Sequence, residues 1–212
     1  MKTDELIQNL TEQAKPVKPM KIGIYLLVWL VFSIVTMVAM MFVTGPRMDA
    51  HVHLENVNFY IEGILAVLMA GSGLYAAGLL FMPDVGQKKK AVWLPFLPLS
   101  AFAGLAIFSL ITEPVSSQEM QWNITCFGDI ATLVIPSLVL LFFMVVRASC
   151  THWHLLCMTA SLGVGGLAYI ISRMMCSEDS LGHVIWFHFV PALVISYVVT
   201  CIGQFLVRKR CC

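Results

Sequence analysis

The sequence predicts an all-α, polytopic integral membrane protein: a bundle of six transmembrane helices with both chain ends in the cytoplasm. Three observations predict this fold class. Hydrophobic residues make up 59% of the 212 residues and charged residues only 12%, whereas a soluble domain carries about 25% charge. Six apolar runs each have the roughly 20 residues that a helix needs to cross a bilayer. The basic residues gather in alternate loops.

The six runs cover residues 22–43, 59–81, 92–111, 124–146, 154–173 and 184–207. The first run is too long for the apolar part of a cleaved signal peptide, and no small-x-small cleavage site follows it. It therefore reads as a retained helix. The predicted organisation is a cytoplasmic tail over 1–20, a six-helix domain over 21–207 and a second cytoplasmic tail over 208–212.

The orientation follows from the distribution of Lys and Arg, which favour cytoplasmic loops. With the N-terminus inside, eleven of the thirteen basic residues fall in cytoplasmic segments. The opposite side keeps only Arg47 and Arg173. The reverse topology would place eleven basic residues outside, so we expect both ends inside.

Small residues and prolines predict how the helices pack. The pairs Ala66 and Ala70, Gly73 and Ala77, and Ser161 and Gly165 recur at helical spacing and allow close approach of helices in a bilayer. Four prolines are candidate kinks: Pro95, Pro98, Pro136 and Pro191.

The seven cysteines include no Cys-x-x-Cys pair and no zinc-type spacing. In the predicted topology only Cys126 and Cys176 share the oxidising side of the membrane, where a disulfide can persist. Closing a loop of about 50 residues would stabilise the fold by roughly 4 kcal/mol in the chain-entropy model. The alternative is two unpaired thiols at helix ends. The remaining five are interpreted as packing residues or tail thiols.

Other polar residues are expected near the same face. Asp129 follows Cys126 by three residues and so lies on the same side of its helix, and His183 and His188 flank the start of the last run. One interpretation is interfacial anchoring, which also suits Glu62 near the start of the second run. The alternative is a redox-sensing or soft-metal site with Cys126, Cys176, His183, His188 and Asp129 as ligands. No resident cofactor is predicted, and a soft metal would act as a signal.

The N-terminal tail carries a short helical pattern. Thr3 suits an N-cap and Asp4 suits the first turn of a helix. Leu6, Ile7 and Leu10 then line one face. The tail is either an unstructured leader or an amphipathic helix that binds in a partner's groove. With a net charge of +1 and no basic stripe, nucleic acid is not expected as a direct partner.

Three function classes compete. A thiol-quinone oxidoreductase would use a vicinal cysteine pair, which this sequence lacks. A transporter would usually place a charge or a broken helix at mid-membrane, and neither is evident in this sequence. A regulator needs only a cytoplasmic binding segment, a membrane span and an external sensor. We therefore expect a regulator and not an enzyme, with a transporter or a thiol-linked redox membrane protein as the alternative.

The sequence opens with Thr3-Asp4-Glu5-Leu6-Ile7-x-x-Leu10 and a Pro/Lys hinge. Further along it has Cys126, Pro136 and Arg147, and then Cys176-Ser177-Glu178-Asp179-Ser180 leading into Trp186. In these motifs the sequence resembles the NrsF-like family, negative regulators of a sigma factor of the extracytoplasmic-function type. Six spans in about 210 residues fit the family's whole length.

The resemblance implies an anti-sigma factor in a bacterial inner membrane, active in transcription regulation and stress response. It would hold an extracytoplasmic-function sigma factor at the bilayer until a periplasmic signal arrives. Cys126 and Cys176 would be the sensor, and the tail with Thr3, Asp4, Leu6, Ile7 and Leu10 would bind the sigma factor.

Overall fold

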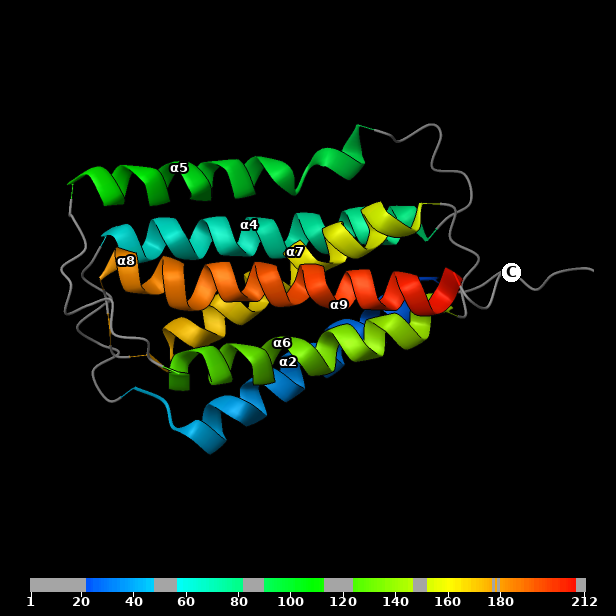
Figure 1. Cartoon of the computed structure of the whole chain (residues 1–212), viewed down its shortest axis with the longest axis horizontal. Coiled ribbons are helices and arrows are strands. Elements are labelled where there is room, and N and C mark those ends of the chain that lie inside the picture. The colour runs from blue at the N-terminus through cyan, green and yellow to red at the C-terminus, as the bar shows by residue number, and fades with distance from the viewer. Residues whose placement is uncertain are drawn as a thin grey trace, which may run out of the picture.

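The computed structural model describes residues 22–47, 57–81, 90–112, 124–146, 152–176, 178 and 180–208. Within these ranges the chain is all-helical and contains no strand, which confirms the predicted all-α class. Six helical segments are long and apolar enough to cross a membrane. Figure 1 shows the long helices running along the long axis of the molecule, with α2 and α7 inclined to α4, α5 and α9.

The helix bounds agree with the predicted runs to within a few residues. The long helices are α2 (Ile22–Thr44), α4 (Val57–Leu80), α5 (Phe96–Thr112), α6 (Ile124–Val146), α7 (Trp153–Arg173) and α9 (Val190–Arg208). Short helical turns precede two of them: the 3-10 turn η2 (Ala91–Trp93) before α5, and α8 (Leu181–Val184) with the π-helical turn η3 (Ile185–Phe189) before α9. The third and sixth predicted runs are therefore interrupted helices.

Two of the candidate kinks coincide with these interruptions. The break between η2 and α5 falls at Leu94 and Pro95, and a proline inside a regular helix removes a hydrogen bond and clashes with the preceding turn. Pro191 is the second residue of α9 and lies two residues beyond the end of the π-helical turn. By contrast, Pro136 lies within α6, which continues through it.

Helix α7 is the central element of the bundle. It packs against α2, α4, α6 and α9. In its 18-residue apolar stretch 72% of the residues are buried, whereas in that of α2 only 17% are buried. Much of the outward surface of the other helices is apolar: Phe42, Val43 and Ile111 are each at least 70% exposed. Exposed apolar surface on this scale is unusual for a soluble monomer, and together with the six long helices it suggests a membrane protein.

Helices α4 and α7 approach closely because small residues face each other. A Cβ atom added at Gly73 would lie 2.6 Å from the backbone nitrogen of Gly163, and one added at Gly166 would lie 2.6 Å from the carbonyl oxygen of Ala66. Three of the four predicted small residues of α4, Ala66, Ala70 and Gly73, therefore lie at a close helix contact. On α7 the contact uses Gly163 and Gly166, because a Cβ atom at the predicted Gly165 would meet nothing within 4 Å.

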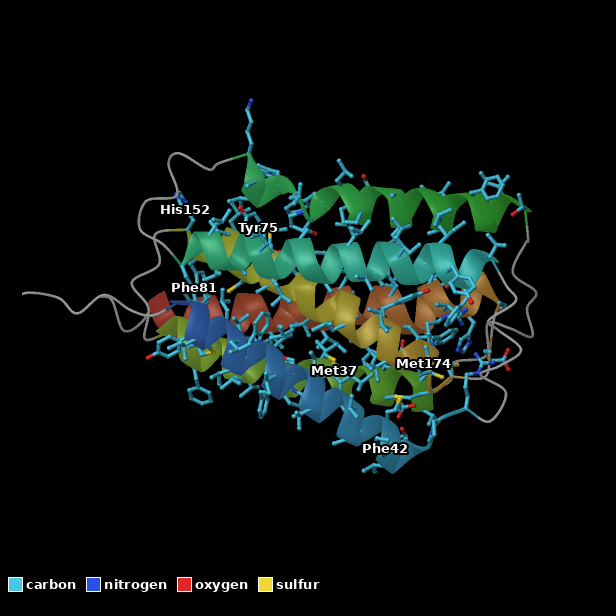
Figure 2. All side chains as sticks on the ribbon, turned by 180° about the vertical axis from the view of Figure 1, so that it is seen from behind. Met37, Phe42, Tyr75, Phe81, His152 and Met174 are labelled. Carbon is cyan, nitrogen blue, oxygen red and sulfur yellow. The ribbon has the colours of Figure 1, made fainter. Side chains whose placement is uncertain are left out.

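The bundle has two distinct ends. The end that we call the Met174 end gathers the last residues of α2, α5 and α7 and the first residues of α4, α6 and α8. Figure 2 shows Met174 and Phe42 toward this end and His152 and Phe81 toward the other, the His152 end.

Aromatic side chains join α5, α7 and η3: Phe102 packs on Tyr169 and Phe189, with ring centroids 5.0 and 4.5 Å apart.

The glycine contact yields a stability prediction. Gly73→Ala should destabilise the protein by about 1–3 kcal/mol because the new methyl group forces α4 and α7 apart. Gly71→Ala is the matched control on the same helix, since a Cβ atom there meets nothing within 4 Å. Thermal unfolding of the detergent-purified variants measures the difference. Equal melting temperatures for the two variants would show that the close contact does not limit stability.

Candidate functional site

Four side chains with metal-binding or redox chemistry converge at the Met174 end. Cys126, Cys176, His183 and His188 each offer one ligand atom, and these four atoms all lie within 4.8 Å of one another. Cys126 is the third residue of α6, and Cys176 lies three residues beyond the end of α7. His183 belongs to α8 and His188 to η3. The structure thus brings together four of the five residues that the sequence analysis proposed as metal ligands.

The cluster is mostly shielded from solvent. Cys126, His183 and His188 are buried and Cys176 is half-buried. The Cys176 Sγ and the His183 Nε2 are 3.6 Å apart, and the two imidazole ring centroids are 5.4 Å apart. Both cysteines are free thiols, so the disulfide between them stays a prediction.

The backbone around the cluster explains how Cys176 reaches it. Beyond Arg173 the chain makes one more turn, in which the Cys176 N–H donates to the Ser172 carbonyl oxygen at 2.9 Å. The His183 N–H donates to the Ser180 hydroxyl at 3.3 Å, which caps the start of α8. The short connection between α7 and α8 therefore holds Cys176 and His183 on the same side.

The π-helical turn η3 brings the two histidines together. In a regular α-helix, residues five apart, such as His183 and His188, point about 140° away from each other. In η3 the Val190 N–H donates to the Ile185 carbonyl oxygen, five residues back, and residues at this spacing then share a side. Pro191 gives a physical reason for the wider turn, because its ring would otherwise clash with the carbonyl of Phe187 four residues earlier.

His188 is the most unusual member of the cluster. It is 2% exposed, and neither of its ring nitrogens has a hydrogen-bond partner within the described part of the chain. Leaving a buried polar group unsatisfied costs about 1–3 kcal/mol. A buried imidazole in this condition beside two thiols is therefore a candidate ligand.

A buried ion pair lies beside the cluster, and sequence reasoning missed it. The Arg173 Nε and the Glu62 Oε2 are 3.4 Å apart, with both side chains 7% exposed. The Tyr169 hydroxyl donates to the same Glu62 oxygen at 2.7 Å. Arg173 Nη1 also donates to the Glu178 carbonyl oxygen at 3.3 Å, within the segment that carries Cys176. The ion pair therefore joins α4, α7 and the connection to α8.

The sequence placed Glu62 and Arg173 at the same face but paired neither of them. A charged residue at the end of a run reads as an interfacial anchor, and the only signal for the pair was that both charges fall at one end of apolar helices. Which helices are neighbours decides the partner, and that is a tertiary property.

The other predicted site residues have different outcomes. Asp129 is half-buried on α6 and is not among the four residues whose ligand atoms are mutually close, so its role as a ligand stays a prediction. The predicted sigma-factor contacts Thr3, Asp4, Leu6, Ile7 and Leu10 lie outside the described residues.

Comparison with known proteins identifies one family. The family model named NrsF, described as negative regulator of sigma F, matches residues 10–208. The match covers nearly the whole chain, including all four residues of the cluster. Neither a curated protein nor a solved structure matches the sequence.

The ion pair yields a second stability prediction. Arg173→Gln should destabilise the protein by about 3–5 kcal/mol because the buried Glu62 carboxylate would lose the cationic partner that lies 3.4 Å away. Tyr169→Phe removes one hydrogen bond to that carboxylate and should cost about 1.5–3 kcal/mol. Denaturant unfolding in detergent of Glu62→Gln, of Arg173→Gln and of the Glu62→Gln/Arg173→Gln double variant measures the coupling between the two side chains. If the single losses simply add in the double variant, the two side chains do not act as a pair.

Proposed function

Because the chain belongs to the NrsF family, the negative regulators of sigma F, we propose that it is a membrane-embedded anti-sigma factor. In this proposal it is a regulator and not an enzyme. It holds a sigma factor of the extracytoplasmic-function type at a bacterial inner membrane, away from RNA polymerase, until a periplasmic signal releases it. The observation that carries the proposal is the family match over residues 10–208.

The apolar exterior and the charge distribution support the proposed location. Six helices have the length and composition of membrane spans, and side chains such as Phe42 and Val43 face outward. Eleven of the thirteen basic residues fall in the sequence before α2, between α4 and α5, between α6 and α7, or at and after the last residue of α9, and the described ends of these segments lie at the His152 end. By the positive-inside rule, that end faces the cytoplasm and the Met174 end faces the periplasm.

The sigma-factor contact is proposed for the cytoplasmic side. The apolar face of Leu6, Ile7 and Leu10 suits a groove in a partner, and Thr3 and Asp4 suit the start of a helix that presents this face. The loop with Lys88, Lys89 and Lys90 adds positive charge at the same end of the bundle. We expect the tail to supply the main contact.

Cys126 and Cys176 are the proposed sensor of the periplasmic signal. They can respond to an oxidant, by losing two protons and passing two electrons to it as the S–S bond forms, or to a metal ion that displaces the thiol protons. Either event joins α6 to the segment that leads into α9. To change the ratio of released to bound sigma factor from 1:99 to 99:1, the signal must stabilise the releasing state over the binding state by about 5.5 kcal/mol.

The position of the two helices supports a path to the cytoplasm. Helices α6 and α9 pack against each other and extend from the cluster to the His152 end, where α9 ends at Arg208. Figure 1 shows α9 continuing from α8 along the length of the bundle. A change at the cluster can therefore move the cytoplasmic ends of both helices relative to each other.

The proposed binding segment can be tested by truncation. A chain lacking residues 1–12 should still insert into the membrane but fail to retain the sigma factor, because the apolar face is removed. Co-purification of the sigma factor from membranes measures this, and a chain lacking only Cys211 and Cys212 is the control. Retention of the sigma factor by the truncated chain would place the binding segment in the loops.

The proposed sensor can be tested by substitution. The Cys126→Ser/Cys176→Ser double variant should keep the sigma factor bound under oxidant or soft-metal exposure that releases it from the unmodified protein. Cys157→Ser is the matched control, because Cys157 is also a buried cysteine but lies on α7 toward the His152 end. Expression of a sigma-dependent reporter measures release. A double variant that responds like the unmodified protein would remove the cysteines from the mechanism.

A further inference from the structure

We infer that Cys126, Cys176, His183 and His188 form one four-coordinate site for Zn²⁺. The inference specifies the chemistry of the cluster, and its regulatory meaning rests on the proposed function. Two thiolates and two imidazoles are the ligand set of many structural zinc sites. A tetrahedral arrangement of two sulfur and two nitrogen donors is typical of zinc among the common metals.

The distances in the cluster suit a tetrahedral ion. With metal–sulfur bonds of about 2.3 Å and metal–nitrogen bonds of about 2.0–2.1 Å, neighbouring donor atoms are roughly 3.3–3.8 Å apart. The Cys176 Sγ and the His183 Nε2 already lie at 3.6 Å. All four donor atoms lie within 4.8 Å of one another, so movements of about 1 Å would complete the coordination shell.

The histidines distinguish a metal site from a simple disulfide. A bond between Cys126 and Cys176 would use two of the four groups and leave the buried His188 without a partner for either ring nitrogen. A metal ion uses all four groups and satisfies one nitrogen of each ring. The π-helical turn matters here, since it places His188 on the same side as His183.

The charge balance also favours a divalent ion. An isolated ion in a buried site is strongly disfavoured, but Zn²⁺ with two thiolates and two neutral imidazoles has no net charge. Cys126, His183 and His188 are all less than 9% exposed. Binding would release the thiol protons and would tie α6 to the segment between α7 and α9.

The test is metal binding by the reduced, full-length protein in detergent, with Co²⁺ as the spectroscopic probe and Zn²⁺ as its competitor. We expect one Co²⁺ per chain, with the intense visible bands of a tetrahedral site and a thiolate-to-cobalt charge-transfer band. Zn²⁺ should displace it. Cys126→Ser and His188→Gln should weaken binding by more than the roughly 10- to 100-fold that loss of an outer-shell group costs.

Matched controls separate ligation from folding. Cys157→Ser and His154→Gln alter a cysteine and a histidine of α7 toward the His152 end and should bind Co²⁺ like the unmodified protein. His188→Cys supplies a third thiolate, so it should still bind Co²⁺ and strengthen the charge-transfer band. Co²⁺ affinity and spectrum that stay unchanged in His188→Gln would overturn the assignment of His188 as a ligand.

Two further results would overturn the inference. The first is that the reduced, unmodified protein binds neither Co²⁺ nor Zn²⁺. The second is that a His183→Gln/His188→Gln variant binds Co²⁺ with unchanged affinity and spectrum. Sigma-factor capture, measured on the same preparations, keeps the two proposals apart. Capture and release of the sigma factor that persist without metal binding would contradict the zinc site and leave the anti-sigma function standing. Metal binding without capture of the sigma factor would contradict the anti-sigma function and leave the zinc site standing.

Discussion

The close contact between α4 and α7 is the constraint on which the rest of the structure depends. The two helices can approach this closely because Gly73 of α4 and Gly166 of α7 have no side chains to separate them. This contact places the end of α7 beside the start of α4, where Arg173 pairs with Glu62. Cys176 follows Arg173 by three residues, so the position of the second thiol is set by the same contact. Between helices in a bilayer there is little hydrophobic driving force, and such backbone-to-backbone packing takes its place.

The chemistry of the molecule is concentrated at one end of an otherwise apolar bundle. The ion pair and the four-residue cluster both lie at the Met174 end, and both involve the short connection between α7 and α8. The ion pair holds that connection against α4, while Cys126 approaches it from α6. Under the proposed function, an event at the cluster would act between α6 and the connection from α7 to α8, and movement of α6 or α9 would transmit it. Such an arrangement suits a switch that responds on one side and acts on the other.

Sequence reasoning predicted much of this fold and part of the site. The apolar runs predicted the helices, because length and hydrophobicity are local properties, and the run at 124–146 agrees with α6 at both ends. The alternating direction of successive helices was enough to predict that Cys126 and Cys176 lie at the same end of the bundle. The partner of Glu62 was not predictable, because it depends on which helices are neighbours. His188 and Asp129 were both predicted ligands, but only His188, which lies in the π-helical turn, belongs to the mutually close set. A pattern with a 3.6-residue period does not reveal such a turn, although Pro191 was a signal for an irregularity there.

In the mechanism that we propose, thiols on the outer side of the membrane control a sigma factor on the inner side. The most direct measurement applies a small, charged, membrane-impermeant thiol reagent to intact spheroplasts and follows both labelling and sigma-factor release. In a chain whose only cysteines are Cys126 and Cys176, we predict labelling from outside together with release, and neither in the chain that lacks both. Labelling that requires a permeabilised membrane, or labelling from outside without release, would contradict the account.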